Sequence, residues 1–258
     1  MSTLQHKIFG IKYGDFRPAN QSREALLTLI KKTALSKLPP QISMIYAPQV
    51  DFTNQTANIN ENYDQWTPWF ARTKTKADGG VVRGNKTAIA FFNGDCPILC
   101  LQQGKKIAAA HAGYRCLIRK NPKEEGIVET TIRQFDPEKT KVFIFGGIGP
   151  CCWLPEYDDK PEILKPILSR HPKILENCLC RTNSNSPFGI KDISVDLYKL
   201  AIELLKRVGV SGNNIATDSR CTCCATENNQ PLFWSYTRFK AGKQMRIDGR
   251  NLSVVWTR

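Results

Sequence analysis

The sequence predicts an α/β fold: a mixed-sheet layered α/β sandwich that forms a single domain. The chain has 258 residues, of which 41% are hydrophobic, and this length supports one large core. Strand-like and helix-like segments follow one another without a strict strand–helix–strand rhythm, which favours a mixed sheet with helices packed outside it. No linker divides the chain by composition, so we expect residues 1–258 to form one domain.

The first third is predicted to contain one helix, one strand and a long loop. Residues 22–35 place apolar side chains on one helical face, capped near Asn20 or Ser22. Residues 41–46 have the apolar pattern of a strand. Residues 52–76 are polar and irregular apart from four aromatic side chains, and we expect a long loop that acts as a lid.

The middle third has the most regular pattern. Residues 87–92 predict a buried strand, which ends in a turn at 93–95. Residues 97–101 and 106–111 are two apolar runs separated by a glycine-containing turn, which predicts a β-hairpin.

The remaining elements alternate between helices and strands. A helix is predicted at 124–135, followed by a strand at 141–145 that runs into a glycine-rich loop. A second amphipathic helix is predicted at 195–207, with Ser194 as its N-cap, and the last strand at 252–256.

Composition and charge limit the classes of partner. The net charge of +14 suits an anionic metabolite, and because no nucleic-acid-binding motif is recognisable, nucleic acid is not the expected partner. No apolar run reaches about 18 residues and no signal peptide is recognisable, so no membrane association is expected. The ten cysteines then fit reduced thiols in the cytoplasm better than a disulfide framework.

Cys96 and His111 are the residues most suited to chemistry. Both lie at the open end of the predicted hairpin, where a cross-strand pair shares one metal or one proton. Two uses stay open: a zinc site with a position left for water, or a nucleophile and its base. The other two histidines, His6 and His171, stand among polar residues and are expected at the surface.

Other chemical signals are weaker. Asp95 and Arg115 flank the pair, where a carboxylate can orient a ligand and a guanidinium can hold a phosphate. The loop at 146–153 lacks the lysine of a P-loop and the third glycine of a dinucleotide site. The segment 221–224 has one C-x-x-C spacing but no second pair at zinc-ribbon distance, which argues against a structural zinc there.

Taken in order, several segments resemble the YfiH-type purine nucleoside phosphorylase family, whose members are also labelled laccase-domain or multicopper polyphenol oxidase proteins. The resemblance covers roughly residues 78–258. It is carried by the segments Asn93-Gly94-Asp95-Cys96-Pro97, His111-Ala112-Gly113-Tyr114-Arg115, Gly147-Ile148-Gly149-Pro150-Cys151-Cys152, Cys221-Thr222-Cys223, Phe233-Trp234-Ser235-Tyr236 and Gly249-Arg250-Asn251-Leu252-Ser253.

This resemblance implies a layered α/β fold, one zinc ion, and phosphorolysis of adenosine, inosine and methylthioadenosine with adenosine deaminase side activity. The family's cysteine ligand matches Cys96 and one histidine ligand matches His111, whereas the other histidine position holds Asp51. Arg115 matches the family's arginine, but Cys116 replaces the glycine that normally follows. Copper oxidation is not expected, because three histidines cannot supply a multicopper site.

Three functions are compatible with these residues. In the first, Cys96, His111 and Asp51 bind zinc, Asp95 orients the nucleophile, Arg115 holds phosphate with help from Arg238, and the aromatic segment at 63–70 covers the purine. In the second, a metal-free hydrolase uses Cys96 and His111 on an amide of a cytoplasmic peptidoglycan precursor. In the third, a degenerate relative binds a partner through its basic surface without turnover.

Overall fold

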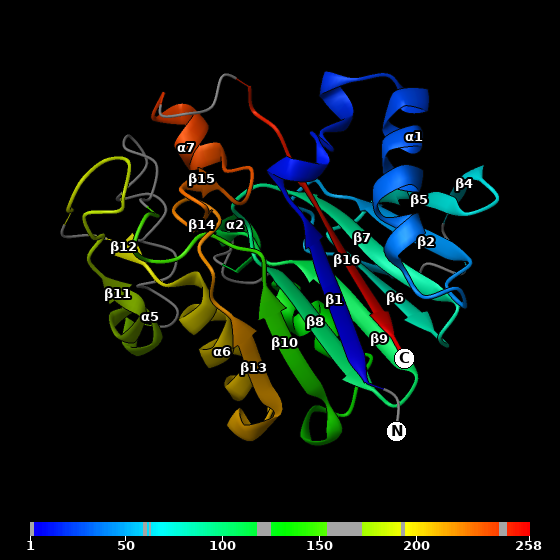
Figure 1. Ribbon diagram of the computed structural model, residues 1–258. Coiled ribbons are helices and arrows are strands. Elements are labelled where there is room, and N and C mark those ends of the chain that lie inside the picture. The colour runs from blue at the N-terminus through cyan, green and yellow to red at the C-terminus, as the bar shows by residue number, and fades with distance from the viewer. Residues whose placement is uncertain are drawn as a thin grey trace.

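Two large mixed β-sheets form the centre of the computed structural model, which describes residues 3–58, 61, 63–117, 125–153, 172–191, 194–242 and 247–258 (Figure 1). The first sheet has, in spatial order, β1 (Leu4–Phe9), β16 (Asn251–Thr257), β7 (Thr87–Asn93), β2 (Met44–Gln49), β5 (Phe70–Lys76) and β4 (Asp64–Thr67). The second has β13 (Ile215–Asp218), β10 (Lys141–Phe145), β8 (Ile98–Gln103), β9 (Lys106–His111), β6 (Gly79–Arg83) and β3 (Thr56–Asn58).

Helices cover the outer faces of both sheets. The helices in the part of the chain that the structure describes are α1 (Arg23–Thr33), α2 (Tyr114–Leu117), α3 (Ile127–Ile132), α5 (Pro172–Cys178), α6 (Leu197–Arg207) and α7 (Tyr236–Lys240). One buried cluster lies between the two sheets, a second joins the first sheet to α1, and a third joins the second sheet to α2, α3 and α6. The predicted layered α/β sandwich is therefore confirmed. No helix in the described ranges is long and apolar enough to cross a membrane.

The central strands β8 and β9 contain continuous apolar runs because both of their faces are buried. In β8, Ile98 and Cys100 face the other sheet, whereas Leu99 and Leu101 face the helices. The same alternation holds in β9, where Ile107 faces the other sheet. Such strands lose the alternation of apolar and polar residues and read as continuous hydrophobic runs.

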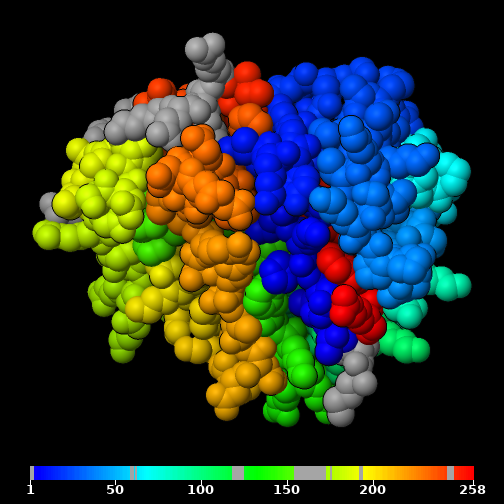
Figure 2. Space-filling view, in the orientation of Figure 1, coloured from blue at the N-terminus to red at the C-terminus, as the bar shows by residue number. Residues whose placement is uncertain are grey.

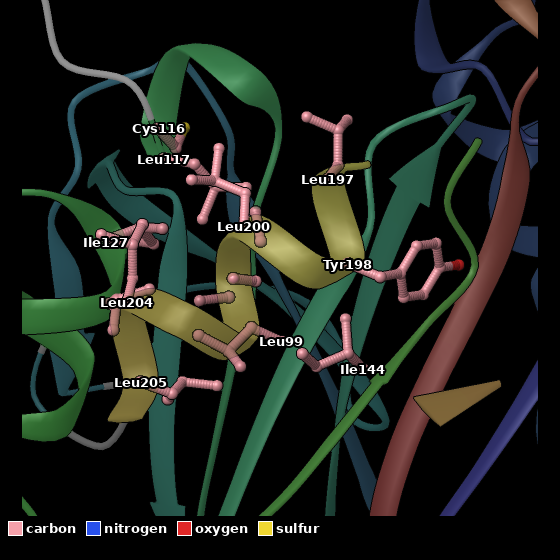
Figure 3. Packing of buried hydrophobic residues seen from close by; sticks show 14 of the residues in the cluster. Leu99, Cys116, Leu117, Ile127, Ile144, Leu197, Tyr198, Leu200, Leu204 and Leu205 are labelled. Atoms are coloured by element: carbon pink, nitrogen blue, oxygen red, sulfur yellow. The ribbon is translucent and has the colours of Figure 1, made fainter. Parts of the chain in front are cut away.

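Helix α6 packs its apolar stripe onto the second sheet, as Figure 3 shows for Leu200, Leu204 and their neighbours. The cap differs from the prediction: the Asp196 carboxylate accepts the Lys199 N–H at 3.0 Å and is the N-cap. Ser194 instead lies in β12 (Ser194–Val195), which pairs with β11 (Leu179–Cys180). Its hydroxyl donates to the backbone carbonyls of Pro150 and Trp153 in the glycine-rich loop, at 2.8 and 2.7 Å.

Most other sequence predictions have the correct type of element, but several of the elements begin or end at other residues than predicted. Ser22 caps α1, accepting the Ala25 N–H at 3.2 Å. The strands at 87–92, 141–145 and 252–256 are confirmed as β7, β10 and β16. The strand at 41–46 begins later, as β2, and the helix at 124–135 is observed over the shorter α3, with residue 124 outside the described ranges.

The prediction of a long loop at 52–76 is wrong. This segment forms β3, β4 and β5, and β5 pairs in parallel with β2. Its polar composition is misleading because β4 is an edge strand and the last three residues of β5 are exposed. Trp66 and Trp69 pack against the cluster under α1, so they form part of that core rather than a lid.

The two ends of the described chain lie next to each other, where Leu4 of β1 pairs with Thr257 of β16 (Figure 1). In Figure 2 the N-terminal segment (blue) crosses the visible face of the molecule beside residues of the last third of the chain (orange). Ile11 N–H donates to the Leu232 carbonyl at 3.3 Å, and the Lys12 ammonium pairs with the Glu227 carboxylate at 3.1 Å. Within the last third, β14 (Thr226–Glu227) and β15 (Gln230–Pro231) form a short hairpin.

Candidate functional site

The hairpin of β8 and β9 brings Cys96 and His111 together at its open end, as its turn predicted. Ile98 pairs with His111 in the ladder, and Ala112 N–H donates to the Pro97 carbonyl at 2.8 Å. A Cβ atom built on Gly113 would lie 2.8 Å from Cys96 Sγ and 3.1 Å from His111 Nε2. The thiol and the imidazole therefore face each other across a space that only glycine leaves open.

Asp78 holds the opposite edge of the imidazole. Its side chain is fully buried at the start of β6, and its Oδ1 lies 3.6 Å from His111 Nδ1. The same carboxylate accepts backbone N–H groups from Phe52 at 2.9 Å and Asn54 at 2.8 Å, and the Thr53 hydroxyl at 3.1 Å. Asp78 thus fixes both the ring and the loop at 51–54, which reverses direction through positive φ angles at Phe52 and Asn54.

The neighbours of His111 stabilise its charged form. Burial lowers the pKa of the imidazole, but the electrostatic interaction with Cys96 and the hydrogen bonds to Asp78, Cys116 and Cys96 outweigh it, and the pKa lies well above its usual range. An imidazole between a thiol and a carboxylate can carry a proton between them. It can equally give up its proton to bind a metal, with the carboxylate fixing its orientation.

Cys116 stands on the Asp78 side of the ring rather than on the Cys96 side. Its Sγ lies 3.6 Å from His111 Nδ1, and ligand atoms of Asp78, His111 and Cys116 all lie within 4.8 Å of one another. His111 therefore has two candidate ligand environments, Cys96 at Nε2 and the Asp78–Cys116 pair at Nδ1. The Asp78 carboxylate already accepts four hydrogen bonds from the loop at 51–54, which favours the Nε2 side for a metal.

Asp51 lies in the loop that wraps around Asp78, but its carboxylate points to another partner. It forms an ion pair with Lys76, and its side chain is about half exposed. Its backbone N–H, not its carboxylate, reaches Asp78. The neighbouring Phe52 makes an edge-on contact with the His111 ring, with ring centroids 5.5 Å apart.

Asp95 does not face the Cys96–His111 pair through its carboxylate. Its Oδ1 accepts the Thr222 hydroxyl at 2.7 Å, and its Oδ2 accepts the Thr237 N–H at 2.7 Å. Burial raises the pKa of this carboxyl, and these hydrogen bonds partly offset the rise. Asp95 thus ties the turn that carries Cys96 to two distant segments.

The two predicted arginines lie in different environments. The Arg115 side chain is exposed next to the site, where its guanidinium stands over the Phe52 ring at 5.4 Å and its Nε donates to the Tyr114 hydroxyl at 2.9 Å. Arg238 is 5% exposed and donates to the Phe233 carbonyl at 3.3 Å. Only Arg115 has a described contact with a neighbour of His111, through Phe52.

The glycine-rich loop packs against other residues of the protein rather than around an open ligand site. A Cβ atom on Gly147 would lie 2.4 Å from Pro97 Cγ, next to Cys96. The Gly147 N–H donates to the Tyr198 hydroxyl at 2.8 Å, and Figure 3 shows that hydroxyl extending away from α6. The loop therefore braces the turn that carries Cys96.

Two residues of the site were missed from the sequence, and one histidine outside the site was misjudged. Asp78 precedes Gly79-Gly80 at the start of a strand, which is a recognisable but weak signal, and Phe52 had none. His6 was expected at the surface, but it is half-buried, with its ring 4.4 Å from that of Phe143. His171 lies outside the described residues.

Substituting Asp78 with asparagine tests its bracing role. We expect the free energy of unfolding to fall by about 1–3 kcal/mol, because an amide cannot accept every hydrogen bond from the loop at 51–54. Urea unfolding measures the change. The matched control is Asp51→Asn, which removes a half-exposed ion pair but keeps the backbone N–H that reaches Asp78, and it should cost less than about 1 kcal/mol. Equal losses in the two variants would contradict the bracing role.

Comparisons with known proteins identify the family of this chain and support its fold. Residues 31–258 match the family described as multi-copper polyphenol oxidoreductase laccase. The chain is 30% identical over 185 residues to the purine nucleoside phosphorylase YfiH of Escherichia coli (strain K12), a stretch that covers 70% of this chain and 64% of that protein. The chain therefore spans less than two thirds of this relative's length.

Two solved structures share the fold. A Bacillus licheniformis hypothetical protein YfiH superposes with a TM-score of 0.67 at 16% identity, covering 94% of this chain and 85% of that one. YlmD from Geobacillus stearothermophilus superposes with a TM-score of 0.67 at 18% identity, covering 100% and 92%. The predicted family resemblance is confirmed: this chain belongs to the multi-copper polyphenol oxidoreductase laccase family, which includes the YfiH proteins.

Proposed function

We propose that this chain is a zinc-dependent purine nucleoside phosphorylase that acts on adenosine, inosine and methylthioadenosine, with adenosine deamination as a side activity. The observation that carries the proposal is the approach of Cys96 Sγ and His111 Nε2 to the same space above Gly113. The name of the relative from Escherichia coli supports the reaction class. The free thiols favour a reducing compartment, and we propose a cytoplasmic location.

The donor set fits zinc. A thiolate and a neutral imidazole are preferred zinc ligands, and a carboxylate on the far ring nitrogen orients such a histidine. Cys96 and His111 would hold the ion, with the Asp51 carboxylate as a third ligand once it leaves Lys76. When bound, the ion would act as a Lewis acid that polarises an oxygen atom and lowers the pKa of a water molecule.

Three other side chains would serve the substrates. The Arg115 guanidinium offers a fork of donors to a phosphate oxyanion, and its exposure leaves it accessible to phosphate. The Phe52 ring, 47% exposed beside His111, offers a face on which a purine can stack. Asp95 holds the Cys96 turn in place, so we assign it a positioning role.

The reaction has a simple balance. A phosphate oxygen attacks C1′ of the ribose, the bond from C1′ to the purine nitrogen breaks, and the purine leaves with the electron pair and takes up a proton. The test is release of free base and ribose 1-phosphate from each nucleoside with and without phosphate. We expect base release only with phosphate, and ammonia release from adenosine without it. No turnover of any of the three nucleosides would overturn the proposal.

The Phe52→Ala variant tests the stacking face. We expect KM for the nucleoside to rise about 5- to 150-fold with a smaller change in kcat, because base–aromatic stacking is worth about 1–3 kcal/mol. Steady-state kinetics at saturating phosphate measures the split. The Phe52→Tyr variant keeps an aromatic face and should remain close to the unmodified protein. An unchanged KM in Phe52→Ala would remove Phe52 from the substrate site.

One observation favours a second function. Cys96, His111 and Asp78 stand in the order of nucleophile, base and orienting carboxylate, which suits a metal-free hydrolase acting on an amide of a peptidoglycan precursor. A chelator should leave that activity intact, whereas a thiol-alkylating reagent should abolish it.

Steep salt-dependent binding without any turnover would instead favour a partner-binding role for the basic surface.

A further inference from the structure

Four cysteine thiols meet where the end of the glycine-rich loop packs against the turn at 221–225. The Sγ atoms of Cys151, Cys152, Cys221 and Cys224 all lie within 4.8 Å of one another, and those of Cys151 and Cys224 are 3.6 Å apart. In a tetrahedral zinc site with Zn–S bonds of about 2.3 Å, the sulfur atoms are about 3.8 Å apart. The four thiols therefore already stand near the spacing that one zinc ion requires.

Backbone hydrogen bonds build this arrangement. The Cys152 N–H donates to the Gly149 carbonyl at 3.1 Å, which closes the first turn, and the Ala225 N–H donates to the Cys221 carbonyl at 3.0 Å, which closes the second. The Thr222 N–H then donates to the Gly147 carbonyl at 3.1 Å and docks the two turns together.

Gly149 leaves the room for this cluster. A Cβ atom built on Gly149 would lie 3.1 Å from Cys151 Sγ and 3.7 Å from Cys221 Sγ, so a larger residue would press into the thiols. Cys152 and Cys221 are buried, whereas Cys151 and Cys224 are partly exposed, which leaves a route for an ion to enter.

A positive charge acts on this cluster, because the guanidinium of the buried Arg238 interacts electrostatically with Cys224. Four thiolates around one zinc ion carry a net charge of −2, and the buried Arg238 guanidinium offsets part of it. Thiolates are the form in which cysteine binds metals.

We propose that Cys151, Cys152, Cys221 and Cys224 bind one zinc ion in a closed structural site, separate from the Cys96–His111 pair. With all four positions filled by thiolates, no position remains for water, so the ion joins the two turns rather than taking part in the reaction. The sequence shows only half of the site as a C-x-x-C spacing, because the adjacent pair Cys151–Cys152 supplies the other half.

The test uses a full-length chain in which the other candidate site is emptied by Cys96→Ala and His111→Ala. Purified under reducing conditions without a metal-affinity tag, this double variant should retain about one zinc ion per chain by elemental analysis. Replacement by Co²⁺ should give the intense visible absorption and the thiolate-to-cobalt charge-transfer band of a tetrathiolate site. Adding Cys224→Ser should remove both, whereas adding Cys180→Ser, at a thiol outside the cluster, should leave both unchanged.

A second measurement needs no change in the cluster. Alkylation of the folded double variant, followed by mass spectrometry, should find the four thiols protected until a strong chelator is added. Absence of bound zinc in the double variant together with free alkylation of the four thiols would overturn the proposal. A Cys151–Cys224 disulfide in protein prepared without reductant, with no zinc uptake after reduction, would overturn it as well and would identify a redox pair instead.

Discussion

The Gly113→Ala variant should lose at least about 100-fold in kcat/KM for phosphorolysis while remaining folded. The added Cβ atom would lie 2.8 Å from Cys96 Sγ and 2.9 Å from His111 Cε1, so the thiol and the imidazole must move apart. A displacement of about 1 Å in a reacting constellation can cost about 100-fold in rate. Steady-state kinetics and circular dichroism on the same preparation measure the effect.

The matched control for this variant is Gly94→Ala, in the turn that precedes Cys96. A Cβ atom there would have its nearest neighbour, the Tyr236 nitrogen, at 3.6 Å, which is an ordinary contact. We expect this control to keep activity within about threefold, because single substitutions without a steric clash usually have small effects. Full activity in Gly113→Ala would mean that the reaction does not use the space between Cys96 and His111.

The Cys96→Ala and His111→Ala variants should each lose activity by on the order of 10³-fold or more, because each removes half of the described donor pair. The double variant should be about as active as the less active of the two single variants. The effects of substituting residues that act as one unit are not additive. Phosphate-dependent release of base from inosine measures all three.

The Cys116→Ala variant tests on which side of the His111 imidazole the reaction takes place. Cys116 contacts Nδ1, whereas Cys96 faces Nε2, so this variant should keep most of its activity if the reaction takes place on the Cys96 side. Loss of activity in Cys116→Ala together with activity retained in Cys96→Ala would move the site to the cluster of Asp78, His111 and Cys116.

The Cys96–His111 pair could be predicted because the information that places it is local. A short turn fixes the register of a hairpin, and the register fixes which residues meet at its open end. The layered fold could be predicted for a related reason: strands buried on both faces and amphipathic helices have different apolar periods.

The rest of the site depends on contacts between distant segments. Asp78 accepts hydrogen bonds from the loop at 51–54, and no periodic pattern in the sequence predicts these contacts. The segment at 52–76 is polar because β3 and β4 are edge strands and the end of β5 is exposed, and edge strands resemble loops in composition. The four-cysteine cluster joins residues some 70 positions apart, so spacing along the chain could not indicate it.

The central claim is that Cys96 and His111 hold a zinc ion for phosphorolysis. The most direct test is the zinc content of protein purified without a metal-affinity tag, compared with that of Cys96→Ala prepared in the same way. We predict a difference of about one zinc ion per chain, whatever the four-cysteine cluster contains. Equal zinc content in the two proteins, with phosphorolysis intact in the unmodified chain after exposure to a chelator, would contradict the account.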